Sequence, residues 1–474
     1  RGCTRSGSRA TPASVERVSA HVTTVAPART REILALALPA MAALAADPLL
    51  SLVDTALVGR LGAVPLAALG INTAVFTAVF WVFNFLTYAT TAEVAALRGA
   101  GRPEAAARYA LQALWLAVGL GSLVTLVLSL AAPLVVALMG AAPEVVPDAL
   151  DYLRIRAFAA VPVLVVAVGH GAFRGLKDTR TPLWVALATN AINAVLSAAL
   201  IYGVGLGVAG AAWGTLVAQT GAAVAFLLLA RRAFPLPDLR VDTAAMRSVV
   251  RISRDLFLRT ASLLAALTVT TAVAARMGTV TVAAHQIARE LWTMLTLVLD
   301  GFAIAGQALV GTALGAGRVQ VARRDARVLL WWGLGAGVVA GAAYLALGGV
   351  LPGVLSEDDA VLDAVASVWP VVVALQPVGG VVFVLDGVLM GAGDFRFLFV
   401  STAAAALGVL VPLSVAALLL DWGLLGIWVG MAGLMAVRGG LILWRLRDGS
   451  WARVRHGSQE AVPPTTGALP AEPA

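Results

Sequence analysis

The chain has 474 residues, of which 60% are hydrophobic and 13% are charged, and its mean hydropathy is +0.90. A soluble domain carries about 25% charged residues, so this composition excludes an ordinary water-soluble globular protein. The net charge of +8 would favour nucleic acid as a partner in a soluble protein. Here the basic residues cluster between long apolar segments, which indicates membrane topology and no nucleic-acid role.

Long apolar segments follow one another along the whole chain. Each has roughly the twenty residues that a helix needs to cross the bilayer, whereas the strands of a membrane barrel would alternate in polarity. The sequence therefore predicts an all-α integral membrane protein. We expect twelve transmembrane helices, over residues 33–59, 66–96, 109–139, 152–176, 181–203, 209–230, 256–278, 282–314, 328–350, 366–392, 395–420 and 422–446.

The loops between these helices alternate in charge. Basic clusters occupy 98–108, 174–180 and 318–327, whereas acidic residues occupy the loops after the third and ninth helices, for example Glu144 and Glu357. Basic loops stay on the cytoplasmic side of a membrane. We therefore expect a multi-pass protein of the plasma or inner membrane with both termini in the cytoplasm.

Composition also divides the chain into segments. We expect disordered tails at 1–30 and 449–474, because both are polar or rich in proline. Between them we expect an N-lobe of six helices at 31–230 and a C-lobe of six helices at 256–448. The arginine-rich segment 231–255 is interpreted as the cytoplasmic linker between the lobes.

The two lobes repeat each other at one gapless offset. Gly99-Ala100-Gly101-Arg102 matches Gly315-Ala316-Gly317-Arg318, which lies 216 positions later (317 − 101 = 216). A repeat of six spans leaves both halves with the same orientation in the membrane. The halves should then be related by a pseudo-two-fold axis along the membrane normal, with a cavity between them near the midplane. This architecture is typical of secondary transporters.

Two carboxylates lie in the first predicted helix. Asp54 lies about five residues from the outer end of the helix, and Asp47 is deeper, directly before Pro48. Ionisable groups are costly inside a membrane and usually serve a function. A carboxyl group whose access to water alternates can bind and release a coupling proton, and Pro48 can act as a hinge because it lacks an N–H. The alternative for both acids is a hydrogen-bonded structural carboxyl group.

Other polar residues inside the predicted helices are candidates for the cavity. Several recur at the repeat offset: Asn84 corresponds to Asp300, and His170 corresponds to Asp386. Interhelical hydrogen bonding is the alternative role for the asparagines, and Arg259 could instead form a structural ion pair with one of the aspartates. The candidate substrate and cavity residues are Asn84, His170, Asn190, Asn193, Arg259, Asp300, Gln307 and Asp386.

The sequence contains no Walker motif, metal-ligand cluster or nucleophile–histidine–acid set. An ATP-driven pump and an enzyme are therefore disfavoured, and we expect no cofactor or metal. A membrane scaffold, or an enzyme that uses scattered intramembrane carboxylates, stays as an alternative of a different class.

Four segments resemble one family. The segment 52–62 (LVDTALVGRLG) resembles the first helix of the multidrug and toxic compound extrusion (MATE) transporters, and 253–260 (SRDLFLRT), 299–303 (LDGFA) and 385–387 (LDG) resemble their DinF subfamily. The resemblance covers about residues 31–450. It implies a two-lobe antiporter that exports amphipathic organic cations in exchange for protons or Na⁺.

The resemblance also assigns roles to single residues. Asp54 matches the coupling carboxylate of the family, and Asn193 matches a polar position of its N-lobe. Ser197 stands where many relatives have an acid, so coupling would depend on Asp54, aided by Asp47. The seventh helix lacks the mid-span glutamate of some sodium-coupled relatives, which favours protons.

Several transporter alternatives remain open at this point. A major-facilitator transporter has the same number of spans, and a lipid-intermediate flippase or a metabolite exporter belongs to the same superfamily as the MATE transporters. For the preferred interpretation, the partners are the lipid bilayer and a cationic, amphipathic small molecule, and we expect the protein to be a monomer.

Overall fold

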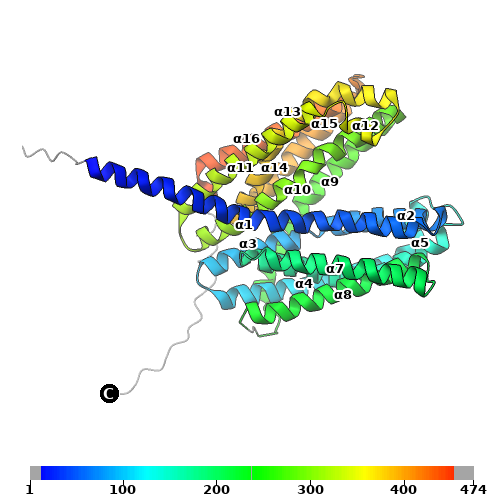
Figure 1. Ribbon diagram of the computed structural model, residues 1–474, viewed down its shortest axis with the longest axis horizontal. Coiled ribbons are helices and arrows are strands. Elements are labelled where there is room, and N and C mark those ends of the chain that lie inside the picture. The colour runs from blue at the N-terminus through cyan, green and yellow to red at the C-terminus, as the bar shows by residue number, and fades with distance from the viewer. Residues whose placement is uncertain (1–11, 236–237, 453–474) are drawn as a thin grey trace, which may run out of the picture.

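The computed structural model describes residues 12–235 and 238–452, apart from the side chains of residues 12–28 and of Asp47. Every regular element in these ranges is helical (Figure 1). The first half of the chain forms α1 (Pro12–Gly59), α2 (Ala63–Val82), α3 (Phe85–Gly99), α4 (Pro103–Leu138), α5 (Val146–Ala157), α6 (Ala160–Gly175), α7 (Arg180–Ala198), the π-helix η1 (Ala199–Gly203) and α8 (Val208–Ala233).

The second half begins with longer, less interrupted helices. Its elements are α9 (Thr243–Met277), α10 (Thr279–Gly315), α11 (Val319–Ala346), the short α12 (Leu351–Leu355), α13 (Asp359–Ala392), α14 (Phe395–Ala405), the π-helix η2 (Ala406–Leu410), α15 (Val411–Leu419), α16 (Gly423–Asp448) and the 3₁₀-helix η3 (Ser450–Ala452).

The number of membrane spans agrees with the prediction. Eleven helices in the described residues are long and apolar enough to cross a membrane, and α5 and α6, bent by 47° at their junction, make a twelfth when counted as one span. At that bend Pro162 has no N–H to donate to the carbonyl group of Phe158, which weakens the helix there. The predicted all-α membrane fold is confirmed.

Three predicted segment boundaries differ from the structure. Helix α1 begins at Pro12, inside the predicted tail 1–30. Helix α9 begins at Thr243, inside the predicted linker 231–255, because the Asp242 carboxylate accepts hydrogen bonds from the first-turn N–H groups of Ala244 and Ala245. At the other end, Trp451 is buried within the predicted tail 449–474. Residues 1–11 and 453–474 lie outside the described residues.

The sequence repeat appears in the structure as matched helix crossings. Gly175 packs on the backbone of Thr91 in the N-lobe, and Gly391 packs on Gln307 in the C-lobe; a Cβ atom would lie 2.8 Å from the Thr91 oxygen and 2.6 Å from the Gln307 oxygen. Glycine is needed at both positions because the backbones touch. The same offset of 216 relates Gly121–Val161 to Gly337–Pro377 and Gly210–Ile201 to Gly426–Ala417.

The pseudo-two-fold relation also holds across the interface between the lobes. A Cβ atom on Gly99 would meet the backbone of Thr312, and one on Gly315 would meet the backbone of Ala96. Each contact is the image of the other under the 216-residue offset. The symmetry axis therefore passes between α3 and α10, which belong to different lobes.

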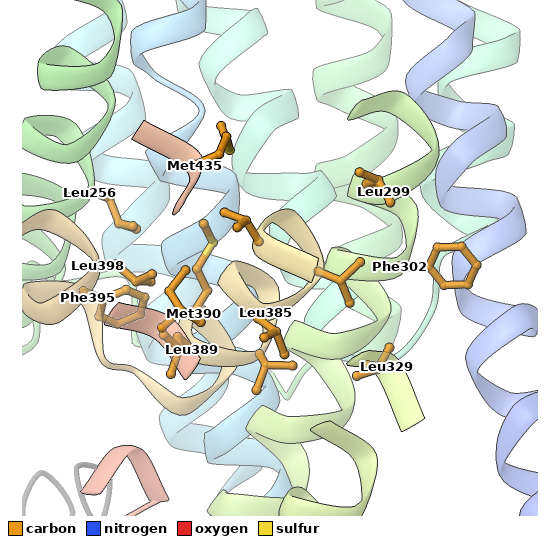
Figure 2. Packing of buried hydrophobic residues seen from close by; sticks show 14 of the residues in the cluster. Leu256, Leu299, Phe302, Leu329, Leu385, Leu389, Met390, Phe395, Leu398 and Met435 are labelled. Carbon is orange, nitrogen blue, oxygen red and sulfur yellow. The ribbon is translucent and has the colours of Figure 1, made fainter. Parts of the chain in front are cut away.

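The core of the C-lobe is built around α10 and α13, which pack along each other. Leu299 and Phe302 of α10 and Leu385 and Leu389 of α13 belong to one cluster of buried hydrophobic residues (Figure 2). Helices in lipid are held together mainly by such close packing, since lipid tails are as apolar as leucine. This pair of helices carries Asp300, Gln307 and Asp386, three of the predicted cavity residues.

The two lobes converge at one end of the molecule and diverge toward the other (Figure 1). The loops 100–102, 176–179, 316–318 and 393–394 lie at the converging end, which we call the basic end because these loops and their flanks are rich in arginine. The loops 60–62, 139–145, 204–207 and 347–350 lie at the opposite end.

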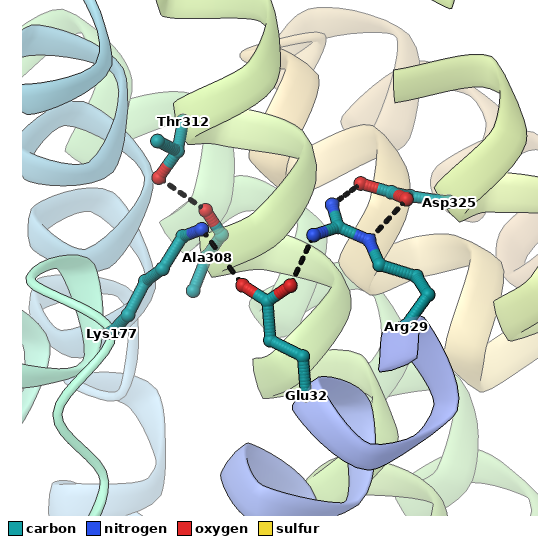
Figure 3. A network of polar contacts seen from close by, with 6 residues as sticks. All are labelled: Arg29, Glu32, Lys177, Ala308, Thr312 and Asp325. Atoms are coloured by element: carbon teal, nitrogen blue, oxygen red, sulfur yellow. Dashed lines mark hydrogen bonds and ion pairs between the residues drawn. The ribbon is translucent and has the colours of Figure 1, made fainter. Parts of the chain in front are cut away.

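Ion pairs join the lobes at the basic end. Arg29 of α1 donates through Nε to Oδ1 of Asp325 on α11, at 2.6 Å, and a second guanidinium nitrogen contacts Oδ2 (Figure 3). Arg29 also pairs with Glu32, which accepts a 3.1 Å hydrogen bond from Lys177 in the loop between α6 and α7. The network therefore spans α1, the N-lobe loop and the C-lobe.

Candidate functional site

A cavity of about 450 Å³ lies between the lobes. It is bounded by α1, α2, α3, α6, α7 and α8 on the N-lobe side and by α9, α10, α13 and α16 on the C-lobe side. Its volume lies in the range of small-molecule sites. Seven of the eight predicted cavity residues line it: Asn84, His170, Asn190, Arg259, Asp300, Gln307 and Asp386.

The cavity has a partly aromatic wall. Trp292 of α10 and Phe383 of α13 both line it, with ring centroids 5.9 Å apart and ring planes 50° apart. Trp81, at the end of α2, lines the N-lobe side. Aromatic and aliphatic walls of this kind bind the apolar body of a ligand, while a few polar groups fix its orientation.

An arginine–aspartate–arginine cluster lies in the C-lobe wall. Arg259 of α9 donates through Nη2 to Oδ2 of Asp386 on α13, at 2.6 Å, and Arg438 of α16 donates through Nη2 to the same oxygen. Arg438 is fully buried and was not predicted as a site residue. Its position inside a predicted transmembrane helix is the signal that would have identified it.

Asp300 of α10 lines the same wall, but none of the ion pairs found between described residues includes it. It lies within electrostatic range of Arg259, Arg438 and Arg174. Arg174, near the end of α6, is also buried at the cavity, although its position at a predicted helix end suggested a loop residue. Among the described residues no group of His, Cys, Asp or Glu side chains has the arrangement of a metal site.

Two lining residues connect helices around the cavity. Gln307 of α10 donates through Nε2 to the carbonyl oxygen of Tyr88 on α3, at 2.6 Å, and so links the two lobes. The ring of His170 packs against Phe226 of α8 with a centroid separation of 5.0 Å. The counterpart of His170 under the repeat is Asp386, and both line the cavity as the offset predicted.

Asn193 does not line the cavity, contrary to expectation. It is buried between α7 and α8, where Nδ2 donates to Oγ1 of Thr215 at 3.2 Å. Its Oδ1 accepts a 2.7 Å hydrogen bond from Ser197. The small residues on α8 bring that helix close to this face of α7, so Asn193 faces protein and not the open space between the lobes.

Asp54 lies outside the cavity, in the half of the N-lobe nearer the opposite end. One carboxylate oxygen, Oδ1, is buried and has no hydrogen-bond partner among the described residues. Arg156 of α5 lies within electrostatic range, and its guanidinium group stands 5.2 Å from the centroid of the Phe76 ring. Arg156 was not among the predicted site residues, because the sequence does not show that a side chain of α5 approaches Asp54.

Helix α7 and its continuation η1 make hydrogen bonds to the backbone of α1 on either side of Asp54. Asn190 of α7 donates to the carbonyl oxygen of Ala46 at 2.9 Å, and Tyr202 of η1 donates to that of Leu57 at 2.6 Å. Pro48 lies between these anchor points, and α1 continues through it as one helix. The side chain of Asp47 is outside the described residues.

The family model described as MatE matches residues 39–199 and 257–416. The chain is 35% identical over 439 residues to the protein DETOXIFICATION 44, chloroplastic, of Arabidopsis thaliana, covering 89% of this chain and 83% of that protein. It is 30% identical over 436 residues to the DNA damage-inducible protein F of Escherichia coli (strain K12), covering 88% and 92%.

The fold comparison agrees. A crystal structure described as MATE in the bent conformation superposes with a TM-score of 0.83 at 22% identity, over 90% of this chain and 97% of that one. The resemblance to the MATE transporters and their DinF subfamily is confirmed by these relatives. The chain therefore belongs to the MatE family, and it is a multi-pass membrane transporter and not an enzyme.

Proposed function

We propose that this transporter is a secondary antiporter that exports small amphipathic molecules through the cavity between its lobes, in exchange for protons. The observation that supports this proposal most is the separation of two polar sites in one membrane protein. The cavity holds the groups that can bind a substrate, whereas Asp54 lies apart from it in the N-lobe. Two separate sites that are joined by a moving element allow the exchange of a substrate for protons.

Helix α1 is the element that can join the two sites. Ala43 and Leu44 line the cavity, and Asp54 lies three helical turns further along the same helix. Protonation of Asp54 would cancel its attraction to Arg156 and so remove the electrostatic interaction between α5 and this half of α1. The helix could then bend at Pro48 between its two anchors on α7 and η1, and so change the cavity wall.

The basic end is proposed to face the cytoplasm, with both termini there, because arginine-rich loops are retained on that side. The structure then represents a form closed to the cytoplasm by the Arg29–Asp325 pair and by the α3–α10 crossing, with lobes that diverge outward. The inward-open form requires both contacts to separate. One chain contains the whole cavity, so we propose that it works as a monomer in the plasma or inner membrane.

The substrate is proposed to contact both the aromatic wall and the charged wall of the cavity. A cationic group on an amphipathic molecule would be attracted to Asp300, the lining carboxylate outside the arginine–aspartate cluster. Trp81, Trp292 and Phe383 can receive the apolar part, and their ring faces also attract cations. This arrangement supports the organic-cation substrate that the resemblance implied.

The test is efflux from proteoliposomes driven by a pH gradient, with a fluorescent organic cation as substrate. Wild-type protein should export the dye, and a protonophore should stop the export. Asp54→Asn should abolish proton-driven export, whereas Asp363→Asn, which removes an exposed acid near the start of α13, should leave it intact. Full proton-driven export by a well-folded Asp54→Asn variant would contradict the proposed coupling.

A further inference from the structure

The arginine–aspartate–arginine cluster in the cavity wall carries more positive than negative charge. Arg259 and Arg438 share the single carboxylate of Asp386, and Asp300, which also lines the cavity, forms no ion pair with either arginine among the described residues. One positive charge is therefore in excess in a space that the helices shield from bulk water. Charges are costly in such surroundings unless they are paired, so an excess of one sign attracts a ligand of the other sign.

Hydrogen bonding in the arginine–aspartate–arginine cluster is also incomplete. Both guanidinium groups donate to the same oxygen of Asp386, Oδ2. The Nε of Arg259 and the Nε and Nη1 of Arg438 are buried and have no acceptor among the described residues. Buried polar groups of native proteins are nearly always hydrogen-bonded, and a guanidinium group offers five N–H donors in a planar fork that matches a carboxylate.

We propose that Arg259 and Arg438 form a binding site for an anionic group of the exported molecule, so that the substrate class includes aromatic carboxylates and zwitterions. The aromatic wall adjoins this site, since the Arg438 guanidinium lies 5.7 Å from the centroid of the Phe383 ring. Asp300 lies within electrostatic range of both arginines and can take the cationic end of a zwitterion. The proposal rests on the export cavity described above and specifies the molecules that it accepts.

Binding to the purified protein in detergent tests the proposal without any gradient. The probes are the free acid of a rhodamine dye and its methyl ester, which share one cationic fluorophore and differ in the carboxylate. Fluorescence anisotropy should show that the wild type binds the acid more tightly than the ester by about tenfold or more, as expected for hydrogen bonds to charged groups. Equal binding of the two dyes, or tighter binding of the ester, would overturn the proposal.

Variants at Arg438 test whether this residue causes the preference for the acid dye. Arg438→Gln should remove the preference for the acid, and Arg438→Lys should reduce it, because lysine keeps the charge and loses the planar fork. Arg396→Gln, which removes an exposed arginine outside the cavity, is the matched control and should keep the preference. Unchanged selectivity in a folded Arg438→Gln variant would overturn the assignment.

A variant at another position tests the proposal even if the variants of Arg438 fail to fold. Asp300→Asn leaves the Arg259–Asp386–Arg438 contacts in place and raises the excess positive charge. It should strengthen binding of fluorescein, an aromatic anion, by several-fold and weaken binding of the rhodamine ester. Weaker binding of fluorescein by this variant would contradict an anion site.

Two sources of the anionic group can be separated by competition. Displacement of the rhodamine acid by benzoate identifies a soluble carboxylate, and displacement by lysophosphatidic acid alone identifies a lipid headgroup; either result supports the site, and displacement by neither would overturn it. Acid-selective binding in a protein that transports no dye would contradict the proposed antiport while leaving the anion site intact. Export of the ester but not of the acid would support the proposed antiport and contradict the anion site.

Discussion

Gly315→Ala should shift the transporter toward the form that is open at the basic end. Gly315 of α10 packs on Ala96 of α3, and these helices belong to different lobes. A Cβ atom would overlap the Ala96 carbonyl oxygen and lie 2.7 Å from the carbonyl carbon. The atoms in the way are backbone, so no side-chain rotation relieves the overlap.

The size of the shift follows from where the strain can be released. Overpacking by a methyl group costs about 1–3 kcal/mol. At this crossing the cost falls on the closed form alone, because separation of the lobes removes the overlap. A difference of about 1–3 kcal/mol changes the ratio of closed to open molecules by about 5- to 150-fold.

Gly387→Ala is the matched control. Its Cβ atom would lie 2.7 Å from the carbonyl carbon of Ala303, so the local crowding is the same. Here the crossing joins α13 and α10 within the C-lobe, and separating the lobes relieves nothing. This variant should lower the Tm and leave the balance of forms unchanged.

Spin labels on cysteines at Glu104 and Gln320 report the balance of forms. Both positions are exposed at the basic end and are related by the repeat offset, and Cys3→Ser removes the chain's one natural cysteine. Gly315→Ala should move the label–label distance distribution to longer values, with a smaller fall in Tm than in Gly387→Ala. An unchanged distribution together with an equal fall in Tm would refute the reasoning.

Three further predictions concern single contacts. Asp325→Asn should weaken the pairing with Arg29 by about 1–2 kcal/mol, which is less than the loss of a fully buried ion pair costs, because Arg29 is partly exposed. The variant should also lengthen the distance between the spin labels at positions 104 and 320. An unchanged distance would contradict the role of the pair in closure. Trp451→Ala should cost about 3 kcal/mol or more of stability because the indole is 2% exposed, and thermal unfolding checks this; an unchanged Tm would show that this segment does not support the fold. Asn190→Ala removes the hydrogen bond to Ala46, worth about 1 kcal/mol, and should slow efflux with a smaller effect on Tm; normal efflux would exclude this anchor from the transport cycle.

The features predicted well from sequence are those that a membrane imposes on single residues. Long apolar runs indicated the spans because a helix satisfies all of its backbone hydrogen bonds within one segment, as lipid requires. The repeated glycines indicated two equivalent lobes, and the structure shows why they recur: Gly175 and Gly391, for example, each allow two helix backbones to touch at equivalent positions. Charges such as Asp300 and Asp386 were placed at the cavity because isolated charges do not face lipid.

The features that escaped prediction depend on which helix faces which. Arg438 contacts Asp386 from 52 positions away in the sequence, and Arg156 approaches Asp54 from a helix that periodicity alone cannot orient. Asn193 was misplaced for the same reason, since its face of α7 is covered by α8. The start of α9 was missed because the cap formed by Asp242 lies within an arginine-rich segment that resembles a linker.

Proton release on substrate binding tests the central claim, exchange of substrate for protons through Asp54, most directly. Purified transporter in weakly buffered detergent solution is mixed with substrate while a pH indicator is followed. Because linkage between two ligands is reciprocal, a substrate that competes with protons must expel them when it binds. Wild-type protein should release protons in proportion to the substrate bound, and Asp54→Asn should bind substrate without release. Substrate binding by the wild type with no proton release at any pH at which it transports would contradict the account.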